Sequence, residues 1–333
     1  MTSIFISIRR RNRWLLLPLL FSVLSYGSAP LYGQGPSQSP KPSSKSAKKT
    51  KKKPEDTVTL VGAGDIAGCD DLSGARATAK LLEEIPGTVF AAGDLAYQSG
   101  TDEEFQKCYG PTWGRFKNRT RPAPGNHEYN GTAANGYFRY WGSQAGEPGK
   151  GYYSYELGTW HIVVLNTNCG ATSLGGCGLG SPQEKWLKQD LAAHPNVCTL
   201  AYGHHALFSS GLLPKHAEHP ELRALWQDLY DSRADLILGG HEHSYERFAP
   251  QDPNGHADPQ NGIREIVAGT GGKSHTILGY AKPNSEVRND NTYGVLKLTL
   301  APGKYNWEFL PEPGKTFHDS GEGICHAQSP PKM

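Results

Sequence analysis

The sequence predicts an α/β fold, and two observations lead to that expectation. Short runs of β-branched and apolar residues alternate with longer segments whose apolar residues recur at helical spacing. Residue types that bind metals follow several of the short runs directly, each next to a glycine. The 333 residues are 20% charged and 37% hydrophobic, an even mixture that excludes a low-complexity, coiled-coil or collagen-like chain.

The expected elements follow one another from residue 57 onward. A β-branched strand at 57–61 precedes a helix at 73–85 and a second strand at 88–92. The segments 152–157 and 160–165 flank a Gly-Thr turn and predict a hairpin. Later elements are strands at 198–202, 236–238, 263–268 and 293–300 and a helix at 221–230.

One more helix is expected to begin after residue 181. Ser181 is a preferred N-cap residue, Pro182 suits the first helical position, and Glu184 completes a capping box. The chain shows no internal repeat. We therefore expect one α/β domain of ~280 residues, which is large enough to bury a substantial core.

The first 56 residues are expected to precede this domain. Residues 1–29 have the pattern of a cleaved signal peptide, with four arginines before a short apolar run and small residues after it. The run is shorter than the ~20 residues of a membrane span, so we expect an exported protein without a transmembrane segment in its mature form. Export would lead to the periplasm, the cell envelope or the extracellular space. Residues 30–56, rich in Ser, Pro and Lys, predict a disordered linker, residues 57–326 the folded α/β domain, and 327–333 a tail.

Charge is distributed unevenly along the chain. Residues 1–54 contain 11 of the 34 Lys and Arg residues and none of the 32 acidic ones, which leaves the rest of the chain with a net charge of −9. An acidic folded part argues against a nucleic-acid-binding surface. The Lys-rich linker is expected to be solvated, with contact to an anionic cell-envelope polymer as the alternative.

Six cysteines in an exported chain predict disulfides. Cys169 and Cys177 enclose a short Gly-rich loop and are expected to pair. The other four cysteines allow three pairings that the sequence does not separate.

Five short motifs carry residues suited to metal binding. Each includes a glycine that lets the backbone turn where a strand ends, which is where open α/β sheets place their sites. The motifs are Gly64-Asp65, Gly93-Asp94 with Tyr97, Gly125-Asn126-His127-Glu128, Gly203-His204-His205 and Gly240-His241-Glu242-His243. Their order along the chain, after successive strands, indicates one shared site.

This series of motifs resembles the calcineurin-like metallophosphoesterases, and within them the small single-domain purple acid phosphatases. The resemblance covers residues 57–320. It implies a four-layer α/β/β/α sandwich around a centre of two metal ions. It also implies hydrolysis of phosphomonoesters of small molecules by attack of a metal-bound hydroxide.

The resemblance also implies a ligand set. Asp94 would bridge the two ions, Asp65, Tyr97 and His243 would complete the first site, and Asn126, His204 and His241 the second. Many relatives carry Asp-x-His at the first motif, whereas this chain has Asp65-Ile66-Ala67 and supplies Tyr97 instead. A phenolate is a hard anionic donor, so we expect Fe(III) in the first site and Fe, Zn or Mn in the second.

Other residues near these motifs are candidates for catalysis. His127 is expected to hold a phosphate oxygen or protonate the leaving group, and His205 to support the ligands. Glu128 is expected to orient His127, with a place in the turn alone as the alternative. A second catalytic histidine would be His216 or His219, between which the spacing does not decide.

A phosphodiesterase or nucleotidase on the same centre is the alternative function. A non-catalytic metal-binding envelope protein is a further alternative, which the full ligand set disfavours.

Overall fold

The computed structural model describes residues 57–326 except for 132, 172, 196–197 and 214–217. The predicted signal peptide, linker and tail and the candidate His216 lie outside these residues. The described residues belong to one compact unit within Lys51–Met333. Within the described part of the chain, no helix combines the length and the apolar character that crossing a membrane requires.

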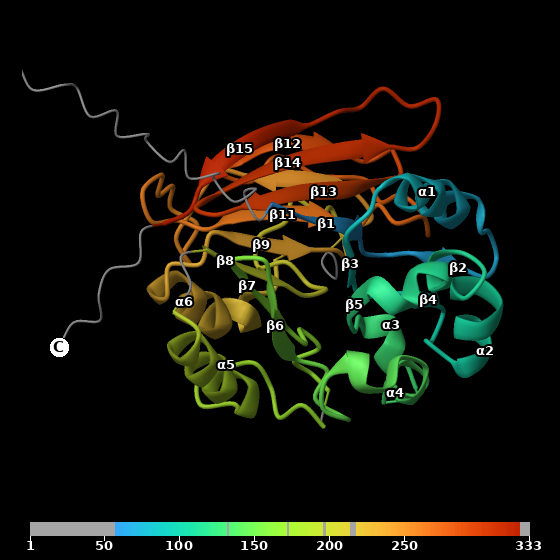
Figure 1. Cartoon of the computed structure of the whole chain (residues 1–333), viewed down its shortest axis with the longest axis horizontal. Coiled ribbons are helices and arrows are strands. Elements are labelled where there is room, and N and C mark those ends of the chain that lie inside the picture. The colour runs from blue at the N-terminus through green and yellow to red at the C-terminus, as the bar shows by residue number, and fades with distance from the viewer. Residues whose placement is uncertain (1–56, 132, 172, 196–197, 214–217, 327–333) are drawn as a thin grey trace, which may run out of the picture. The chain divides into compact units, whose positions relative to one another are not determined.

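Two mixed sheets form the centre of the domain (Figure 1). The first has the strand order β15-β14-β13-β1-β3-β5, in which β1, β3 and β5 are parallel neighbours. The second has the order β12-β10-β11-β9-β8-β7-β6, in which β7, β8, β9 and β11 run parallel. The strands of the first sheet are β1 (Val58–Ala63), β3 (Thr88–Ala92), β5 (Thr120–Ala123), β13 (Gly294–Ala301), β14 (Lys304–Pro311) and β15 (Ser320–Ile324). Those of the second are β6 (Tyr153–Leu157), β7 (Trp160–Val164), β8 (Cys198–Tyr202), β9 (Leu236–Gly239), β10 (Tyr245–Phe248), β11 (Arg264–Ala268) and β12 (Ser285–Asn289).

Helices cover the outer face of each sheet. In Figure 1 the helices α5 and α6 lie together beside the second sheet, and α1 to α4 lie at the opposite side of the domain. The longer helices are α1 (Ser73–Glu84), α4 (Asn135–Trp141), α5 (Pro182–Ala193) and α6 (Arg223–Asp231). Shorter helical turns are α2 (Asp102–Glu104), α3 (Asn126–Tyr129), η1 (Phe105–Tyr109), η2 (Trp113–Arg119), η3 (Gly142–Ala145) and η5 (Pro220–Leu222), and β2 (Ala67–Gly68) pairs with β4 (Ala96–Tyr97).

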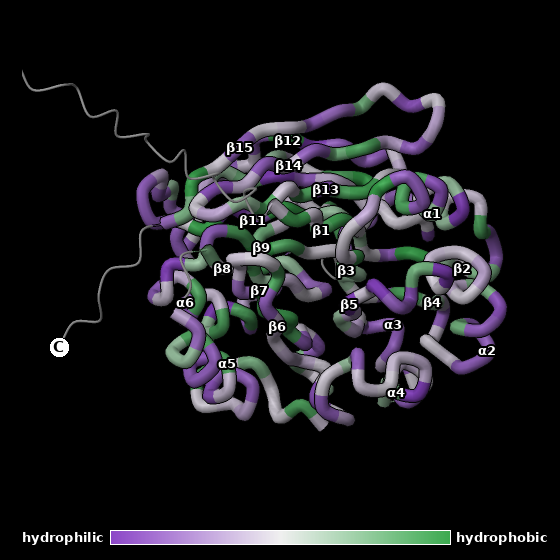
Figure 2. The backbone as a smooth tube through the Cα atoms, viewed as in Figure 1, coloured by the Kyte–Doolittle hydropathy of each residue, from purple (hydrophilic) through white to green (hydrophobic). Residues whose placement is uncertain are grey.

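Successive strand residues divide between three buried clusters. Leu60 of β1 and Leu200 of β8 pack in the central cluster between the sheets. Their neighbours Val61 and Ala201 point the other way, toward the helices on each outer face. This alternation is a consequence of strand geometry, and Figure 2 shows apolar residues along the central strands. The result is the expected four-layer α/β/β/α sandwich.

The expected elements are present, with ends that differ by at most two residues. The strands at 88–92 and 198–202 match β3 and β8, and the predicted hairpin is β6–β7. The helix expected at 221–230 begins instead with the turn η5, and α6 starts at Arg223. Ser181 caps α5 as predicted by accepting a hydrogen bond from the Glu184 N–H. The Glu184 carboxylate accepts a hydrogen bond from Gly180 N–H, so the expected capping box is shifted by one residue.

Three disulfides account for the six cysteines. The predicted Cys169–Cys177 pair is confirmed. Of the pairings left open, the structure forms Cys69–Cys108 and Cys198–Cys325.

Candidate metal centre

The five motifs meet because parallel strands end at the same edge of their sheets. Asp65 follows β1, Asp94 follows β3 and Asn126 follows β5 in the first sheet. His204 follows β8 and His241 follows β9 in the second. The two sets of strand ends face each other across the central layer, which brings residues from distant parts of the sequence into contact.

The backbone at these strand ends has an unusual conformation. Asp65, Asp94 and His241 have positive φ angles of 60°, 52° and 70°. Non-glycine residues adopt this region at an energetic cost, and such residues cluster at functional sites. Neighbouring glycines leave room for the side chains: a Cβ at Gly125 would lie 2.1 Å from Asp94 Oδ1, and one at Gly240 would lie 2.6 Å from Asp65 Oδ2.

One group of donors surrounds the Tyr97 hydroxyl. This hydroxyl lies 2.9 Å from Asp65 Oδ1 and 3.1 Å from Asp94 Oδ2. It also lies 3.2 Å from His243 Nε2, which is 3.3 Å from Asp65 Oδ1. The other ring nitrogen of His243 is hydrogen-bonded with the Ser274 hydroxyl at 2.7 Å, so its orientation is fixed from outside the group.

A second group surrounds the buried ring of His204. Its Nδ1–H donates to the Ala92 carbonyl oxygen at 2.9 Å, so in the neutral ring Nε2 carries the lone pair. Nε2 lies 3.0 Å from Asn126 Oδ1, 3.2 Å from Asp94 Oδ2 and 3.1 Å from His241 Nδ1. A histidine held through one nitrogen by a backbone carbonyl is the usual arrangement of a metal ligand.

The donor set of the two groups fits metal ions. Asp94 Oδ2 belongs to both groups, and the Asp65 and Asp94 side chains are buried with exposures of 0% and 1%. Burial, together with the charges of these two carboxylates, raises the pKa of the Tyr97 hydroxyl well above its ordinary value. A phenolate there would need a cation beside it. Oxygen and imidazole donors without a thiolate suit iron, zinc or manganese.

His127 lies at the edge of the first group. Its Nδ1–H donates to the Gln98 carbonyl oxygen at 2.7 Å, and its ring packs on Tyr97 with 4.4 Å between centroids. Its Nε2 faces Asp94 Oδ2 at 3.8 Å. The ring is therefore held at one nitrogen, and the other nitrogen is directed toward the centre.

Glu128 has a different role from the one expected. Its buried carboxylate accepts hydrogen bonds from the backbone N–H groups of Asp94 at 2.9 Å, Leu95 at 2.8 Å and Gly125 at 2.7 Å. Burial, followed by the Asp94 charge, raises the pKa of Glu128 to about 7. The expectation that it orients His127 is thus corrected: the Gln98 carbonyl orients His127, and Glu128 holds the turn that presents Asp94.

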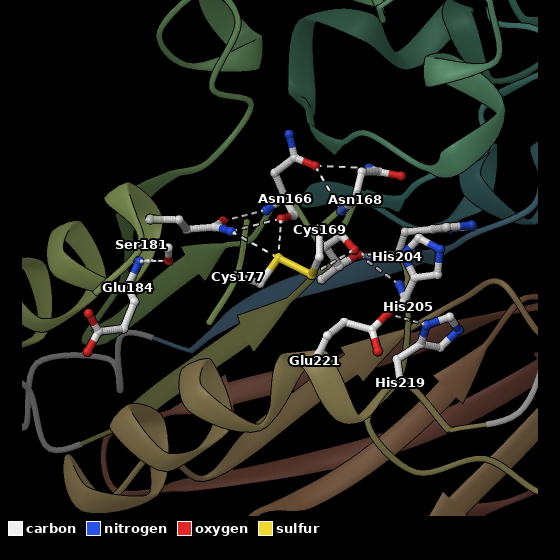
Figure 3. Close-up of a disulfide and its surroundings, with 12 residues drawn as sticks. Asn166, Asn168, Cys169, Cys177, Ser181, Glu184, His204, His205, His219 and Glu221 are labelled. Carbon is white, nitrogen blue, oxygen red and sulfur yellow. Dashed lines mark hydrogen bonds and ion pairs between the residues drawn. A yellow bond between two sulfur atoms is a disulfide. The ribbon is translucent and has the colours of Figure 1, made fainter. Parts of the chain in front are cut away.

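His205 and His219 lie beside the second group (Figure 3). The His205 ring packs at a tilt against the rings of His219 and His241, with centroid distances of 4.5 Å and 4.4 Å, and its Nδ1 is hydrogen-bonded with the Thr167 hydroxyl. His219 Nδ1 bonds with Glu221 Oε1 at 3.0 Å. Its Nε2 is buried and has no hydrogen-bond partner among the described residues. Of the two candidate catalytic histidines, His219 is beside the centre and His216 lies outside the described residues.

Several residues that shape the site have no signal in the sequence. The carbonyl groups of Ala92 and Gln98 act through the backbone, so their side chains carry no information about these bonds. Ser274 and Thr167 are small polar residues in loops, a common combination. Glu221 falls within a segment that is typical of a helix start, and although it is two residues from His219 the sequence does not show that the two side chains are hydrogen-bonded.

A pocket opens next to the second group. It has a volume of about 540 Å³, and Asn126, His205 and His219 lie along it. Tyr129 and Cys169 belong to its walls. The centre is therefore accessible from a cavity large enough for a small organic group.

Comparisons with known proteins agree with this geometry. The calcineurin-like phosphoesterase model matches residues 49–245. A nucleotide pyrophosphatase/phosphodiesterase of Hordeum vulgare is 26% identical over 257 residues, covering 67% of this chain and 68% of the barley protein. Purple acid phosphatase 23 of Arabidopsis thaliana is 27% identical over 203 residues, covering 50% of this chain but 43% of the relative.

A solved structure shares the fold. The purple acid phosphatase from yellow lupin (Lupinus luteus) seeds superposes with a TM-score of 0.60 at 20% identity, covering 83% of this chain and 57% of the lupin chain. The family model spans more than half of the sequence and includes the motifs from Asp65 to His243. The chain therefore belongs to the calcineurin-like phosphoesterase family, as a metal-dependent phosphoesterase with purple acid phosphatases among its relatives.

Proposed function

We propose that the protein is an exported phosphatase that hydrolyses phosphomonoesters at a centre of two metal ions. The family implies a dinuclear centre. The observation that carries the proposal is the sharing of Asp94 Oδ2 between the group around Tyr97 and the group around His204. A shared carboxylate is what two ions ~3.5–4 Å apart require.

The seven donors divide between the two ions. Asp65, Tyr97 and His243 would hold the first, and Asn126, His204 and His241 the second, with Asp94 bridging. The phenol oxygen of Tyr97 favours Fe(III) in the first site, and the second would take divalent Fe, Zn or Mn. A visible charge-transfer band in the oxidised, metal-replete protein is expected. Its absence at full iron occupancy would contradict the assignment.

The metal ions, when bound, act as Lewis acids that offset the negative charge of the phosphoryl group and make water a stronger acid. The protein supplies the remaining proton chemistry. His127, held by the Gln98 carbonyl, directs Nε2 toward the centre, where in its protonated form it donates to a phosphate oxygen or to the departing alcohol.

His219 is suited to a second polar contact with the substrate. Its Nδ1 is held by Glu221, its Nε2 has no hydrogen-bond partner among the described residues, and the residue lines the pocket. In the protonated ring both nitrogens donate, one to Glu221 and the other to an anionic oxygen. We propose that His219 takes the role expected of the second histidine.

Export is supported by two features. Residues 1–29 have the pattern of a signal peptide, and all six cysteines are paired in disulfides, which persist in oxidising compartments.

The test is the rate of hydrolysis of an aryl phosphomonoester across pH, by protein shown to hold two metal ions. We expect turnover that is highest in acid and is abolished by Asp94→Asn, because that change removes the shared anionic donor. Metal-replete protein that does not hydrolyse the monoester would contradict the proposal.

The barley relative gives weight to the alternative of a phosphodiester or nucleotide pyrophosphate substrate. A bis-aryl phosphodiester assayed beside the monoester separates the two, because a phosphatase should favour the monoester.

The alternative of a non-catalytic envelope protein is tested by deleting residues 34–56. A phosphatase should keep its turnover without this segment, whereas an envelope-binding protein should lose its function.

A further inference from the structure

Two loops form the walls of the pocket beside the centre, and hydrogen bonds fix them to each other. The first loop includes Asn126 and Tyr129, and the second includes Asn168 and Cys169. Asn168 in the second loop donates its side-chain N–H to the Pro124 carbonyl, two residues before Asn126, at 3.1 Å. The Tyr129 hydroxyl accepts a hydrogen bond from the Asn166 amide at 2.7 Å. Both walls are thereby held in place relative to Asn126.

The second loop is closed by a disulfide (Figure 3). Cys169 and Cys177 are joined across eight residues, and Gln183 of α5 donates to the Asn166 carbonyl at 2.8 Å. Within the loop, Ala171 N–H donates to the Asn168 carbonyl at 2.9 Å. The disulfide and these hydrogen bonds hold the wall in one conformation before a ligand binds. The wall therefore selects ligands by their fit and does not rearrange around them.

The described walls of the pocket carry few charged side chains. Among its described lining residues none is Lys or Arg, and the one carboxylate is that of Glu221. Residues 132 and 172, which lie outside the described residues, are threonines. Small and aromatic residues such as Tyr129, Ala133 and Ala171 make up much of the wall. A second phosphate entering this space would meet the Glu221 carboxylate, and the described walls offer it no Lys or Arg side chain.

We propose that the pocket receives the alcohol part of a phosphate monoester, and that it selects alcohols that are uncharged or cationic over those that carry a second phosphate or a carboxylate. This inference rests on the proposed function. Under this inference, the loop closed by the disulfide and the Glu221 carboxylate determine which substrates are preferred. The expected preference differs from that of an enzyme for nucleoside polyphosphates.

The test uses two aryl phosphates of matched size, one with a para-carboxamide and one with a para-carboxylate. We expect a higher kcat/KM for the carboxamide. The same pair made as benzylphosphonates gives affinities by calorimetry without turnover, and the carboxamide should again be preferred. Equal affinities and equal kcat/KM values would overturn the inference.

A charge placed in the wall should change this preference. Ser173 lines the pocket and its side chain is exposed, so Ser173→Lys is expected to fold. An exposed ion pair contributes roughly 0.2–1 kcal/mol, so Ser173→Lys should improve binding of the carboxylate relative to the carboxamide by up to about fivefold. Ser173→Gln, of similar length without charge, should leave the ratio unchanged. A ratio that is unaffected by the lysine would count against the proposed pocket.

One cation near the pocket in sequence, Lys215, lies outside the described residues. The inference expects Lys215→Gln to leave the ratio of the two phosphonate affinities unchanged, and a loss of carboxylate binding would overturn it. If no ester is hydrolysed but the phosphonate preference is found, the proposed function fails and the pocket selectivity stands. If esters are hydrolysed without preference, the proposed function stands and the pocket selectivity fails.

Discussion

The carbonyl oxygen of Gln98 fixes the protonation pattern of His127. A carbonyl only accepts, so Nδ1 must carry a proton, and Nε2 is the nitrogen that faces the centre. The ring is also packed against Tyr97. A base or acid held in one orientation acts without first losing rotational freedom, which is an advantage in catalysis.

Replacing His127 should therefore affect turnover and leave the metal centre intact. We expect His127→Ala to reduce kcat for an aryl phosphomonoester by about 10²–10⁴-fold, the usual contribution of general acid–base catalysis, while metal content stays at two per chain. Metal analysis and steady-state kinetics on the same preparation test this. His256→Ala, at an exposed histidine, is the control. Loss of metal together with turnover would show that His127 is structural.

Glu128 acts on the centre through the backbone that carries Asp94. Its two oxygens accept several N–H groups in a buried position, where a glutamine would present an N–H₂ group to some of these donors. We expect Glu128→Gln to lower the free energy of unfolding by about 2–4 kcal/mol and to reduce metal content. Urea unfolding and metal analysis measure the two effects. Glu103→Gln, at an exposed residue, should change neither, and a stable, metal-replete Glu128→Gln protein would contradict the prediction.

Among the secondary-structure elements, α5 is joined to the β6–β7 hairpin by a buried histidine. His161 of β7 contacts Glu156 of β6 through Nδ1 and Asp190 of α5 through Nε2, both at 2.8 Å. The His194 ring stacks on it at 4.6 Å. Burial alone would lower the pKa of His161, but the hydrogen bonds with Asp190 and Glu156 raise it above its ordinary value.

This contact should make stability depend on pH. Because the folded protein binds the His161 proton more tightly than the unfolded chain, its contribution is complete below about pH 6.5, the ordinary pKa of histidine, and is lost as the pH rises through the folded pKa. We expect the free energy of unfolding of His161→Gln to fall furthest below that of the parent protein in acid. The difference between the two should be smaller in alkali. Urea unfolding at several pH values tests this. A difference that is constant across pH would contradict it.

The elements that the sequence predicted well are those with a strong local pattern. β3 and β8 are continuous apolar runs, and α5 has a cap and a proline at its start. The strands β14 and β15 were not anticipated, because they pair at the edge of the first sheet and half of their residues face solvent. The ligand motifs were identifiable because glycine and a polar side chain recur at each strand end. The bonds that orient these ligands involve backbone atoms, which only the fold brings into place.

Across the whole molecule, contacts between the two sheets set the geometry of the centre, because each sheet provides part of it. The Trp160 side chain of the second sheet donates to the Ala301 carbonyl of the first at 3.0 Å. Cys198 begins β8, and its partner Cys325 directly follows β15, so this disulfide also joins the sheets. Trp160, Cys198 and Cys325 all belong to the central buried cluster.

The disulfide between the sheets should contribute more to stability than the one in the pocket loop. The chain-entropy model gives about 5 kcal/mol for closing the 127 residues between Cys198 and Cys325, and about 2.5 kcal/mol for the eight between Cys169 and Cys177. Replacing each pair with alanine and measuring urea unfolding compares them. We expect the Cys198→Ala/Cys325→Ala protein to lose the larger share of stability. The Cys169→Ala/Cys177→Ala protein should show mainly a higher KM for bulky monoesters, because its loop is a wall of the pocket. The opposite ranking of the two stabilities would mean that the other contacts between the sheets hold them together without this disulfide, and that the pocket loop supports the fold.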